Sequence, residues 1–253
     1  MSAKGPGWRS LDGLVWLARV GPAPADTWGA AMGWAPPTVR SHTVRLQRAG
    51  LLERVGRLQS AGGALVYAST FGVDTARARA GVQALALRRP PAPVTWQHAE
   101  VCAQMGAYLT VRGREMIAPR ELLLDDRWLG ELEWIEHGEM RRRGHRPDFV
   151  ATGASGRSIA IELELTVKSA QRLRAVLSMY VAWLAEGRVE SLLYAVGGEL
   201  EHRAVMRHAP DVGLEVGRRF GVRRLGQLTA YEPVPDVTGR ATWSHSVSTC
   251  WSC

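Results

Sequence analysis

A short proline-rich segment limits the fold of this chain more than any other feature. Residues 88–94 read Arg-Arg-Pro-Pro-Ala-Pro-Val, and such a segment cannot sustain a helix or a central strand, because proline lacks a backbone donor. It divides the 253 residues into two stretches that are each long enough to bury a core. We therefore predict a first domain over residues 8–87, a linker over 88–94 and a second domain over 95–232. The Ser/Thr-rich residues 233–253 are predicted to form a flexible tail.

The charge of the chain favours a polyanionic partner. It has 32 basic and 24 acidic side chains and a formal net charge of +8, and binding phosphates with such side chains releases condensed counterions. Lys4 and Lys168 are the only lysines, so the other 30 basic residues are arginine. No run of ~18 apolar residues indicates a membrane span, and the three cysteines cannot build a disulfide framework. We expect a cytoplasmic protein with no membrane partner.

The first stretch shows a pattern of three helices followed by a hairpin. Asp26 is placed as the N-cap of the second helix, and Gly50 ends the third. Helices are predicted over residues 11–18, 27–32 and 37–49, and the runs 51–55 and 64–68 are predicted to pair. The letters PPTVRSHTVRLQRAGLLERVG and GGALVYASTFG resemble a winged helix-turn-helix of the type common in bacterial regulators.

The third helix of a winged helix lies in the major groove, so the resemblance implies binding of double-stranded DNA. Val39, Val44 and Leu46 are predicted to pack inward. The predicted DNA contacts are the side chains left outside: Thr38, Arg40, Ser41, His42 and Arg45. The alternative is that this part serves as a protein-contact or dimerisation module.

The second stretch carries a pattern of carboxylates on neighbouring strands. Residues 146–151 and 158–165 read as two strands joined by a turn. Side chains alternate along a strand, so Glu162 and Glu164 share one face with their Cα atoms about 6.5–7 Å apart. Asp148, on the first strand, can face the same side. The pattern predicts three carboxylates converging on one spot.

Like charges that lie so close repel one another, and either a divalent cation or basic neighbours must offset the repulsion. Hard oxygen ligands favour Mg²⁺ or Mn²⁺, so Asp148, Glu162 and Glu164 are the predicted metal ligands. Lys168 follows Glu164 by four residues and can reach back to stabilise the charge of a phosphoryl transition state. These four residues are the predicted catalytic set. The alternative is a hairpin whose glutamates lie on a solvated face.

Pro147-Asp148 and Glu162-Leu-Glu164, in the order helix–strand–strand–strand–helix–strand, resemble the PD-(D/E)XK nuclease fold of restriction enzymes and Holliday-junction resolvases. Glu164 stands where that motif has Lys. Some members use a lysine from the next helix, and the resemblance gives this role to Lys168.

The same resemblance points to an accessory acid on the first helix of the second domain. Glu100 matches it as a further metal ligand, and Glu121 is a second candidate. The basic run just before Asp148 is predicted to hold DNA phosphates, with a solvated basic loop as its alternative: Arg141, Arg142, Arg143 and Arg146.

Taken together, the winged helix and the segment HRPDFVATGASGRSIAIELELTVKS resemble the replication-relaxation family of actinobacterial plasmids and mobile elements. The resemblance implies an α/β chain with an N-terminal winged helix-turn-helix and a restriction-endonuclease-like αβββαβ domain. It also implies a role in plasmid replication or DNA processing, with metal-dependent endonuclease activity. A non-catalytic regulator, whose second domain dimerises or clamps DNA, is the alternative. A homodimer, and a platform for replication or mobilisation proteins, stay open as partners.

Overall fold

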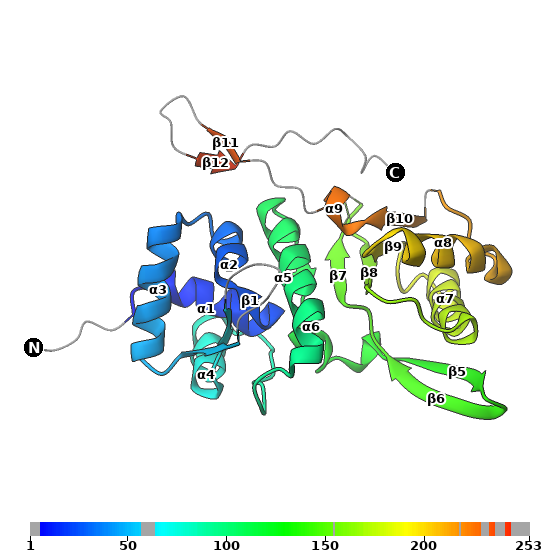
Figure 1. Cartoon of the computed structure of the whole chain (residues 1–253), viewed down its shortest axis with the longest axis horizontal. Helices are drawn as coiled ribbons and strands as arrows, with labels where there is room; N and C mark the ends of the chain where they lie inside the picture. Colours follow the sequence, from blue (N-terminus) through cyan, green and yellow to red (C-terminus); the bar gives the residue numbers. More distant parts are fainter. Residues whose placement is uncertain are drawn as a thin grey trace, which may run out of the picture.

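The structure is a computed structural model, and it describes residues 6–56, 64–153, 155–217, 219–228, 233–235 and 241–243. It is a mixed α/β fold in which a helical first part packs beside a five-stranded sheet (Figure 1). Within these ranges no helix has the length and apolar character needed to cross a membrane. Most of the predicted tail lies outside them, and its described residues form the antiparallel pair β11 (Pro233–Pro235) and β12 (Ala241–Trp243).

The first part has the element order of a winged helix. β1, β3 and β2 form a sheet in that order, and both pairings are antiparallel. The predicted hairpin is thereby confirmed, while residues 57–63 within it lie outside the described ranges. The bounds are α1 (Trp8–Val20), β1 (Ala23–Pro24), α2 (Ala25–Ala31), α3 (Pro36–Arg48), β2 (Leu52–Val55), β3 (Leu65–Ala68) and α4 (Thr70–Ala80).

Close packing of α2 on α3 requires a glycine at the contact. A Cβ on Gly29 would lie 2.3 Å from Cγ2 of Val39. Trp28, next to this glycine, is fully buried, and its indole N–H donates to the carbonyl of Gly13 at 3.0 Å. The small Gly29 thus lets α2 approach α3, and the large ring of Trp28 joins α2 to α1.

The predicted N-cap of α2 is wrong. The helix begins at Ala25, after Pro24, so Asp26 lies in its first turn. The Asp26 carboxylate accepts from the backbone N–H of Thr27 at 2.8 Å, and this places a negative charge near the positive end of the helix dipole.

The second part is built around a sheet in the order β4-β7-β8-β9-β10. β7 is antiparallel to β4 and β8, whereas β8, β9 and β10 run parallel. The elements α5, β4, β7, β8, α7 and β9 follow one another as helix–strand–strand–strand–helix–strand, with further elements inserted between β4 and β7. The first of these strands, β4, precedes the run 120–128 in which a strand was predicted, and the nuclease-like fold stays a prediction. The bounds are α5 (Trp96–Val111), β4 (Met116–Ile117), β7 (Phe149–Thr152), β8 (Ser158–Glu164), α7 (Ala170–Ala185), β9 (Ser191–Val196), α8 (Glu199–His208), β10 (Phe220–Arg224) and α9 (Leu225–Leu228), with 3-10 turns at η1 (Pro93–Thr95) and η3 (Pro210–Val212).

Helices cover both faces of this sheet. Ile161 and Leu163 of β8 belong to one hydrophobic cluster, together with buried residues of α5. Ala160, on the opposite face of β8, belongs to a second cluster with residues of α7 and α8. Because side chains alternate along a strand, Glu162 and Glu164 lie on the α7 face of the sheet.

The segment between β4 and β7 differs from the prediction. A strand-like run expected within residues 120–128 is instead α6 (Pro119–Leu122) followed by the 3-10 turn η2 (Asp126–Trp128). After it comes an unpredicted hairpin of β5 (Gly130–Glu136) and β6 (Glu139–His145), which extends away from the core (Figure 1). β6 is exposed along nearly its whole length, so it lacks the alternation of buried and exposed residues by which a strand is predicted.

The first and second parts share a hydrophobic cluster, which contains buried residues of α1, α2 and α3 together with residues of α5 and β8. Polar contacts reinforce it. The Trp16 indole N–H donates to Thr110 Oγ1 at 2.9 Å, and Arg19 pairs with Glu121 at 3.0 Å. The structure thus joins the two predicted domains through a common core.

Candidate functional site

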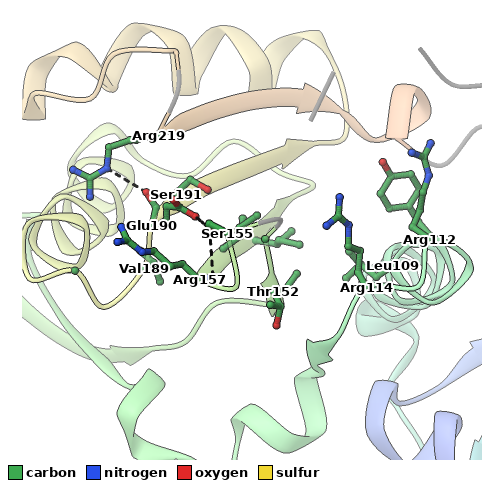
Figure 2. Close-up of a pocket in the computed structure, with 16 residues that line it drawn as sticks. Leu109, Arg112, Arg114, Thr152, Ser155, Arg157, Val189, Glu190, Ser191 and Arg219 are labelled. Atoms are coloured by element: carbon green, nitrogen blue, oxygen red, sulfur yellow. Dashed lines mark hydrogen bonds between the residues drawn. The ribbon is translucent and has the colours of Figure 1, made fainter. Parts of the chain in front are cut away.

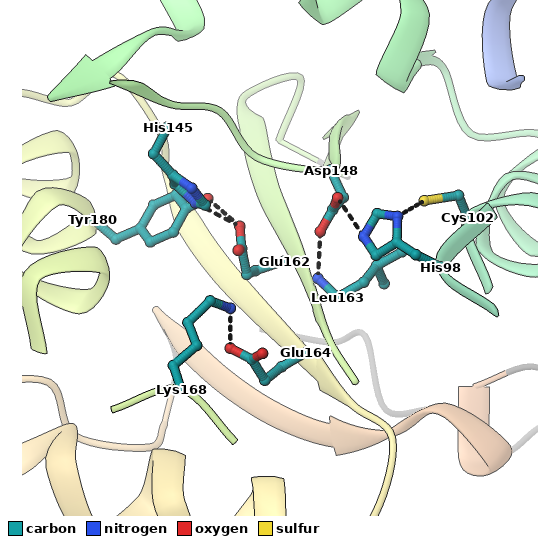
Figure 3. A network of polar contacts seen from close by, with 9 residues as sticks. All are labelled: His98, Cys102, His145, Asp148, Glu162, Leu163, Glu164, Lys168 and Tyr180. Carbon is teal, nitrogen blue, oxygen red and sulfur yellow. Dashed lines mark hydrogen bonds and ion pairs between the residues drawn. The ribbon is translucent and has the colours of Figure 1, made fainter. Parts of the chain in front are cut away.

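The strand pair β7–β8 positions the predicted carboxylates. Asp148 directly precedes β7, and its backbone N–H donates to the carbonyl of Ile161 at 3.0 Å. This pairing holds Asp148 beside the middle of β8. Glu162 is the next residue after Ile161 and Glu164 ends the strand, and each is 3% exposed. The structure therefore brings the three predicted acids to one region of the sheet (Figure 3).

Asp148 is held by a backbone donor and by a histidine that the sequence analysis did not assign. Its Oδ2 accepts from the backbone N–H of Leu163 at 2.7 Å, and its Oδ1 lies 3.2 Å from Nε2 of His98 on α5. Burial raises the pKa of Asp148, and the His98 contact opposes this rise. The other ring nitrogen of His98, Nδ1, lies 3.4 Å from Sγ of Cys102. The three side chains form a continuous polar chain from the sheet into α5.

Glu162 has two partners on different elements. Its Oε2 lies 3.1 Å from Nε2 of His145, at the end of β6, and accepts from the Tyr180 hydroxyl on α7 at 2.8 Å. Burial alone would raise the pKa of this carboxyl, but His145 and then Lys168 outweigh it and lower the pKa. Glu162 therefore remains ionised although it is buried.

Glu164 pairs with Lys168, as the spacing of four residues predicts. The ammonium donates to Oε2 of Glu164, and both side chains are largely buried. Burial raises the pKa of the Glu164 carboxyl, and Lys168 acts in the opposite direction. The position of Lys168 next to the acids is thus observed, while a role in catalysis stays a prediction.

A buried hydroxyl without a partner faces the same carboxylates. Tyr194 of β9 pairs in register with Glu162 and is fully buried. Among the described residues its hydroxyl has no hydrogen-bond partner of good geometry. Burial, followed by the charges of Glu162 and Glu164, raises the pKa of Tyr194 well above its usual range. An orphaned buried hydroxyl marks a place for a further polar species such as water or a hydrated ion.

Each acid therefore has a basic or hydroxyl partner of its own. Of the two solutions expected for the repulsion, the described residues supply basic neighbours: His98, His145 and Lys168. Within the described part of the chain, the ligand atoms that already lie within 4.8 Å of one another belong to His98, Cys102 and Asp148. The carboxylate oxygens of Asp148, Glu162 and Glu164 do not form such a group among the described residues.

Both accessory acids predicted from the sequence lie elsewhere. Glu100 is two residues beyond His98 on α5, about 200° around the helix, so it does not share the face that His98 and Cys102 turn to Asp148. Glu121 pairs with Arg19 and accepts from the backbone N–H of Ala118 at 2.8 Å. The α5 residue that contacts Asp148 is His98, and its spacing of four residues from Cys102 was the signal available for it.

The pair of His145 and Glu162 makes stability depend on pH. Burial alone would lower the pKa of His145, but the Glu162 carboxylate outweighs it and raises that pKa. A folded-state pKa above the unfolded value adds stability that is lost as pH rises through it. We expect the free energy of unfolding, measured by urea titration in EDTA, to fall from about pH 6.5 upward. His145→Gln should flatten this part of the profile, and His202→Gln, as a matched control, should not. Equal slopes for all three proteins would contradict the assignment.

The exposed face of α3 is the candidate nucleic-acid interface. Thr38, Arg40, Ser41 and Arg45 are exposed, as predicted. Val44, which was predicted to pack inward, is 41% exposed and extends this surface.

His42 is a correction, because it was predicted to face DNA but is buried. Its Nδ1 lies 2.6 Å from the Ser10 hydroxyl of α1, and its ring stacks on Trp34 at 4.1 Å between centroids. Burial lowers the pKa of His42, which favours the neutral ring. His42 therefore joins α3 to α1 in this structure, and we leave it out of the interface.

The basic run before Asp148 lies on β6 and just after it. Arg143 is exposed on the hairpin. The other members contact acidic side chains, so the structure offers them ion-pair partners other than phosphate: Arg141 with Glu139 at 3.0 Å, Arg142 with Glu133 at 2.7 Å and Arg146 with Asp126 at 2.7 Å.

Comparisons with known proteins assign no family to the chain. No protein-family model matches it, and no curated protein matches it. A crystal structure of a MepR point mutant from a multidrug-resistant S. aureus clinical isolate is similar to 29% of this chain, with 17% identity and a TM-score of 0.27. The match spans about half of that structure's length, 55%. A likeness this low assigns neither fold nor function, and the resemblances found in the sequence stay predictions.

Proposed function

We propose that this chain binds double-stranded DNA through α3 and hydrolyses a phosphodiester bond at Asp148, Glu162 and Glu164. The observation that carries the proposal is the pair of buried glutamates, Glu162 and Glu164, beside the partly buried Asp148, with Lys168 against Glu164. Burial of several charged groups costs free energy and is common where chemistry requires them. The order of helices and strands around the acids supports the same conclusion, because it is the order that the nuclease resemblance implies.

The residues present suit a hard divalent cation. Asp148, Glu162 and Glu164 would hold Mg²⁺ or Mn²⁺, and the unpartnered hydroxyl of Tyr194 leaves a polar position beside them. When bound, such a cation would polarise the phosphodiester and favour ionisation of an attacking water. Lys168, now paired with Glu164, would then be free to approach the phosphate.

Incubation of the full chain with supercoiled plasmid tests this proposal. We expect nicked or linear DNA with Mg²⁺ or Mn²⁺ and intact DNA in EDTA. Lys168→Ala should bind plasmid as the unaltered chain does and cut it more slowly. Metal-dependent cleavage that is unchanged in Lys168→Ala would remove this residue from the proposed site.

A non-catalytic DNA-binding regulator is the second candidate, and a specific observation favours it. Glu164 occupies the position at which the nuclease motif has lysine, and it is already neutralised by Lys168. A protein of this kind would slow the migration of the plasmid in a gel under every metal condition and would cut it under none. In either case we propose that the DNA process served is the replication or processing of a plasmid or mobile element.

DNA binding by α3 gives a separate prediction. Arg40→Gln and Arg45→Gln are each expected to weaken duplex binding and to reduce the slope of log affinity against log salt by about 1, because each removes one phosphate contact. Fluorescence anisotropy at several salt concentrations measures both quantities. Arg207→Gln, which removes the same charge from exposed α8, is the matched control. Equal weakening in all three variants would indicate a response to net charge alone and not an interface on α3.

A further inference from the structure

A cavity of about 1010 Å³ lies beside the sheet (Figure 2). Its lining includes Ile159 and Ser191, which pair in register near the starts of the parallel strands β8 and β9, and also Ile161. Ile161 packs in the hydrophobic cluster on the α5 face of β8. Ile159 shares that face, whereas Glu162 and Glu164 lie on the α7 face, because side chains alternate along a strand. The cavity therefore lies on the opposite face of β8 from the two glutamates of the proposed hydrolytic site.

The polar lining of this cavity is strongly cationic. Four arginines contribute to it, and Glu190 is the single carboxylate among the described lining residues. Oε2 of that glutamate already accepts from the Ser155 hydroxyl. Arg219 is fixed by donating to the Glu190 carbonyl at 3.2 Å. The remaining three arginines form no ion pair with an acidic side chain in the described part of the chain: Arg112, Arg114 and Arg157.

The lining also includes an apolar part, and one arginine is held against a ring. Leu109 of α5, Ala151 of β7 and Ile159 of β8 supply an uncharged wall. The guanidinium of Arg112 lies 5.1 Å from the centroid of the Tyr108 ring, which also lines the cavity. Cation–π contact holds a guanidinium in place without neutralising it. The cavity thus combines fixed positive charge with a surface suited to an uncharged ring or chain.

We propose that this cavity binds a nucleoside phosphate. Guanidinium groups match phosphate oxygens in a bidentate geometry, which assigns the anionic end of the ligand to the arginines. The volume lies at the upper end of the ~300–1,000 Å³ typical of small-molecule sites, so the ligand is larger than inorganic phosphate and its nucleoside lies along the apolar wall. A free nucleotide and the phosphorylated end of a DNA strand share this chemistry.

Isothermal titration calorimetry on the full chain in EDTA, with ATP and with a 5′-phosphorylated duplex, tests the proposal and separates the two sources. The double variant Arg112→Gln/Arg157→Gln is expected to bind at least about tenfold more weakly, because charge-assisted hydrogen bonds are lost. Arg207→Gln should bind as the unaltered chain does. Loss confined to ATP assigns a free nucleotide. If the double variant loses affinity only for the phosphorylated duplex, and not for the same duplex without the phosphate, the ligand is a strand end.

The proposal would be overturned if the double variant and Arg207→Gln bound both probes equally well. It would also be overturned if neither ATP nor the phosphorylated duplex showed saturable binding. A circular dichroism spectrum like that of the unaltered chain confirms that the double variant is folded. The test does not depend on the proposed hydrolysis, because both variants keep Glu162 and the assay contains no cation. An inactive carboxylate site would leave the binding result unchanged.

Discussion

Glu162→Gln is expected to lower the rate of metal-dependent DNA cleavage by about 10²–10³-fold, the loss typical when one preorganised electrostatic contact is removed from an active site. Glutamine keeps the size of the side chain and an oxygen that can accept from the Tyr180 hydroxyl. It lacks the negative charge that faces His145 and that would hold the cation. DNA affinity should change little, because Glu162 is 3% exposed and α3 is untouched. A single-turnover cleavage assay in Mg²⁺ measures the rate.

Glu186→Gln is the matched control. This glutamate ends α7, is half exposed and pairs with Arg188 at 2.9 Å, remote from the acids on β8. It should cleave at the unaltered rate. Cleavage by Glu162→Gln at that same rate would exclude Glu162 from the chemistry and favour the non-catalytic candidate.

Trp28→Ala is expected to destabilise the chain by about 3–5 kcal/mol, the usual cost of truncating a fully buried large side chain. The ring is 0% exposed, contacts Trp34 edge-on at 5.2 Å between centroids, and donates to the carbonyl of Gly13. Truncation would leave a cavity between α1 and α2 and remove the hydrogen bond from the indole to the carbonyl of Gly13. Urea unfolding followed by circular dichroism gives the change in free energy.

Trp8→Ala serves as the comparison, because Trp8 begins α1 but is 63% exposed. It should shift the free energy of unfolding by no more than about 0.5 kcal/mol. Equal effects for the two tryptophans would show that the core around Trp28 is not packed as described.

The arrangement of side chains along β8 and just after it could be predicted from sequence. Alternation of Ile and Glu along β8 placed Glu162 and Glu164 on one side, and the spacing of Lys168 placed its ammonium at Glu164. Both inferences rest on local geometry, in which the period of a strand or the rise of a turn decides what lies together. β6 is exposed along nearly its whole length and gave no such signal. β5 does alternate, with Leu132 buried between the exposed Glu131 and Glu133, so its strand could have been predicted from the sequence and was not.

Contacts between distant residues could not be predicted in the same way. His145 and Tyr180 meet Glu162 from separate elements, 17 and 18 residues away. The apolar spacing of α7 indicates that Tyr180 is buried but does not say that its hydroxyl faces an acid. The prediction for His42 was wrong for a related reason: the phase of α3 alone does not reveal that Ser10 of α1 meets its Nδ1 and that Trp34 stacks on its ring.

The hydrophobic cluster that joins α1–α3 to α5 and β8 would fix the distance between the DNA sequence that is bound and the position that is cut. A recognition helix and a cutting site on separate, loosely tethered domains would cleave at scattered positions. Here the helix and the acids are built on one continuous core. If both contact the same duplex, the separation between them is fixed, and the cut falls at a constant offset from the bound sequence. Lengthening residues 88–94 would not change that offset, since the shared core and not the proline-rich segment sets the distance.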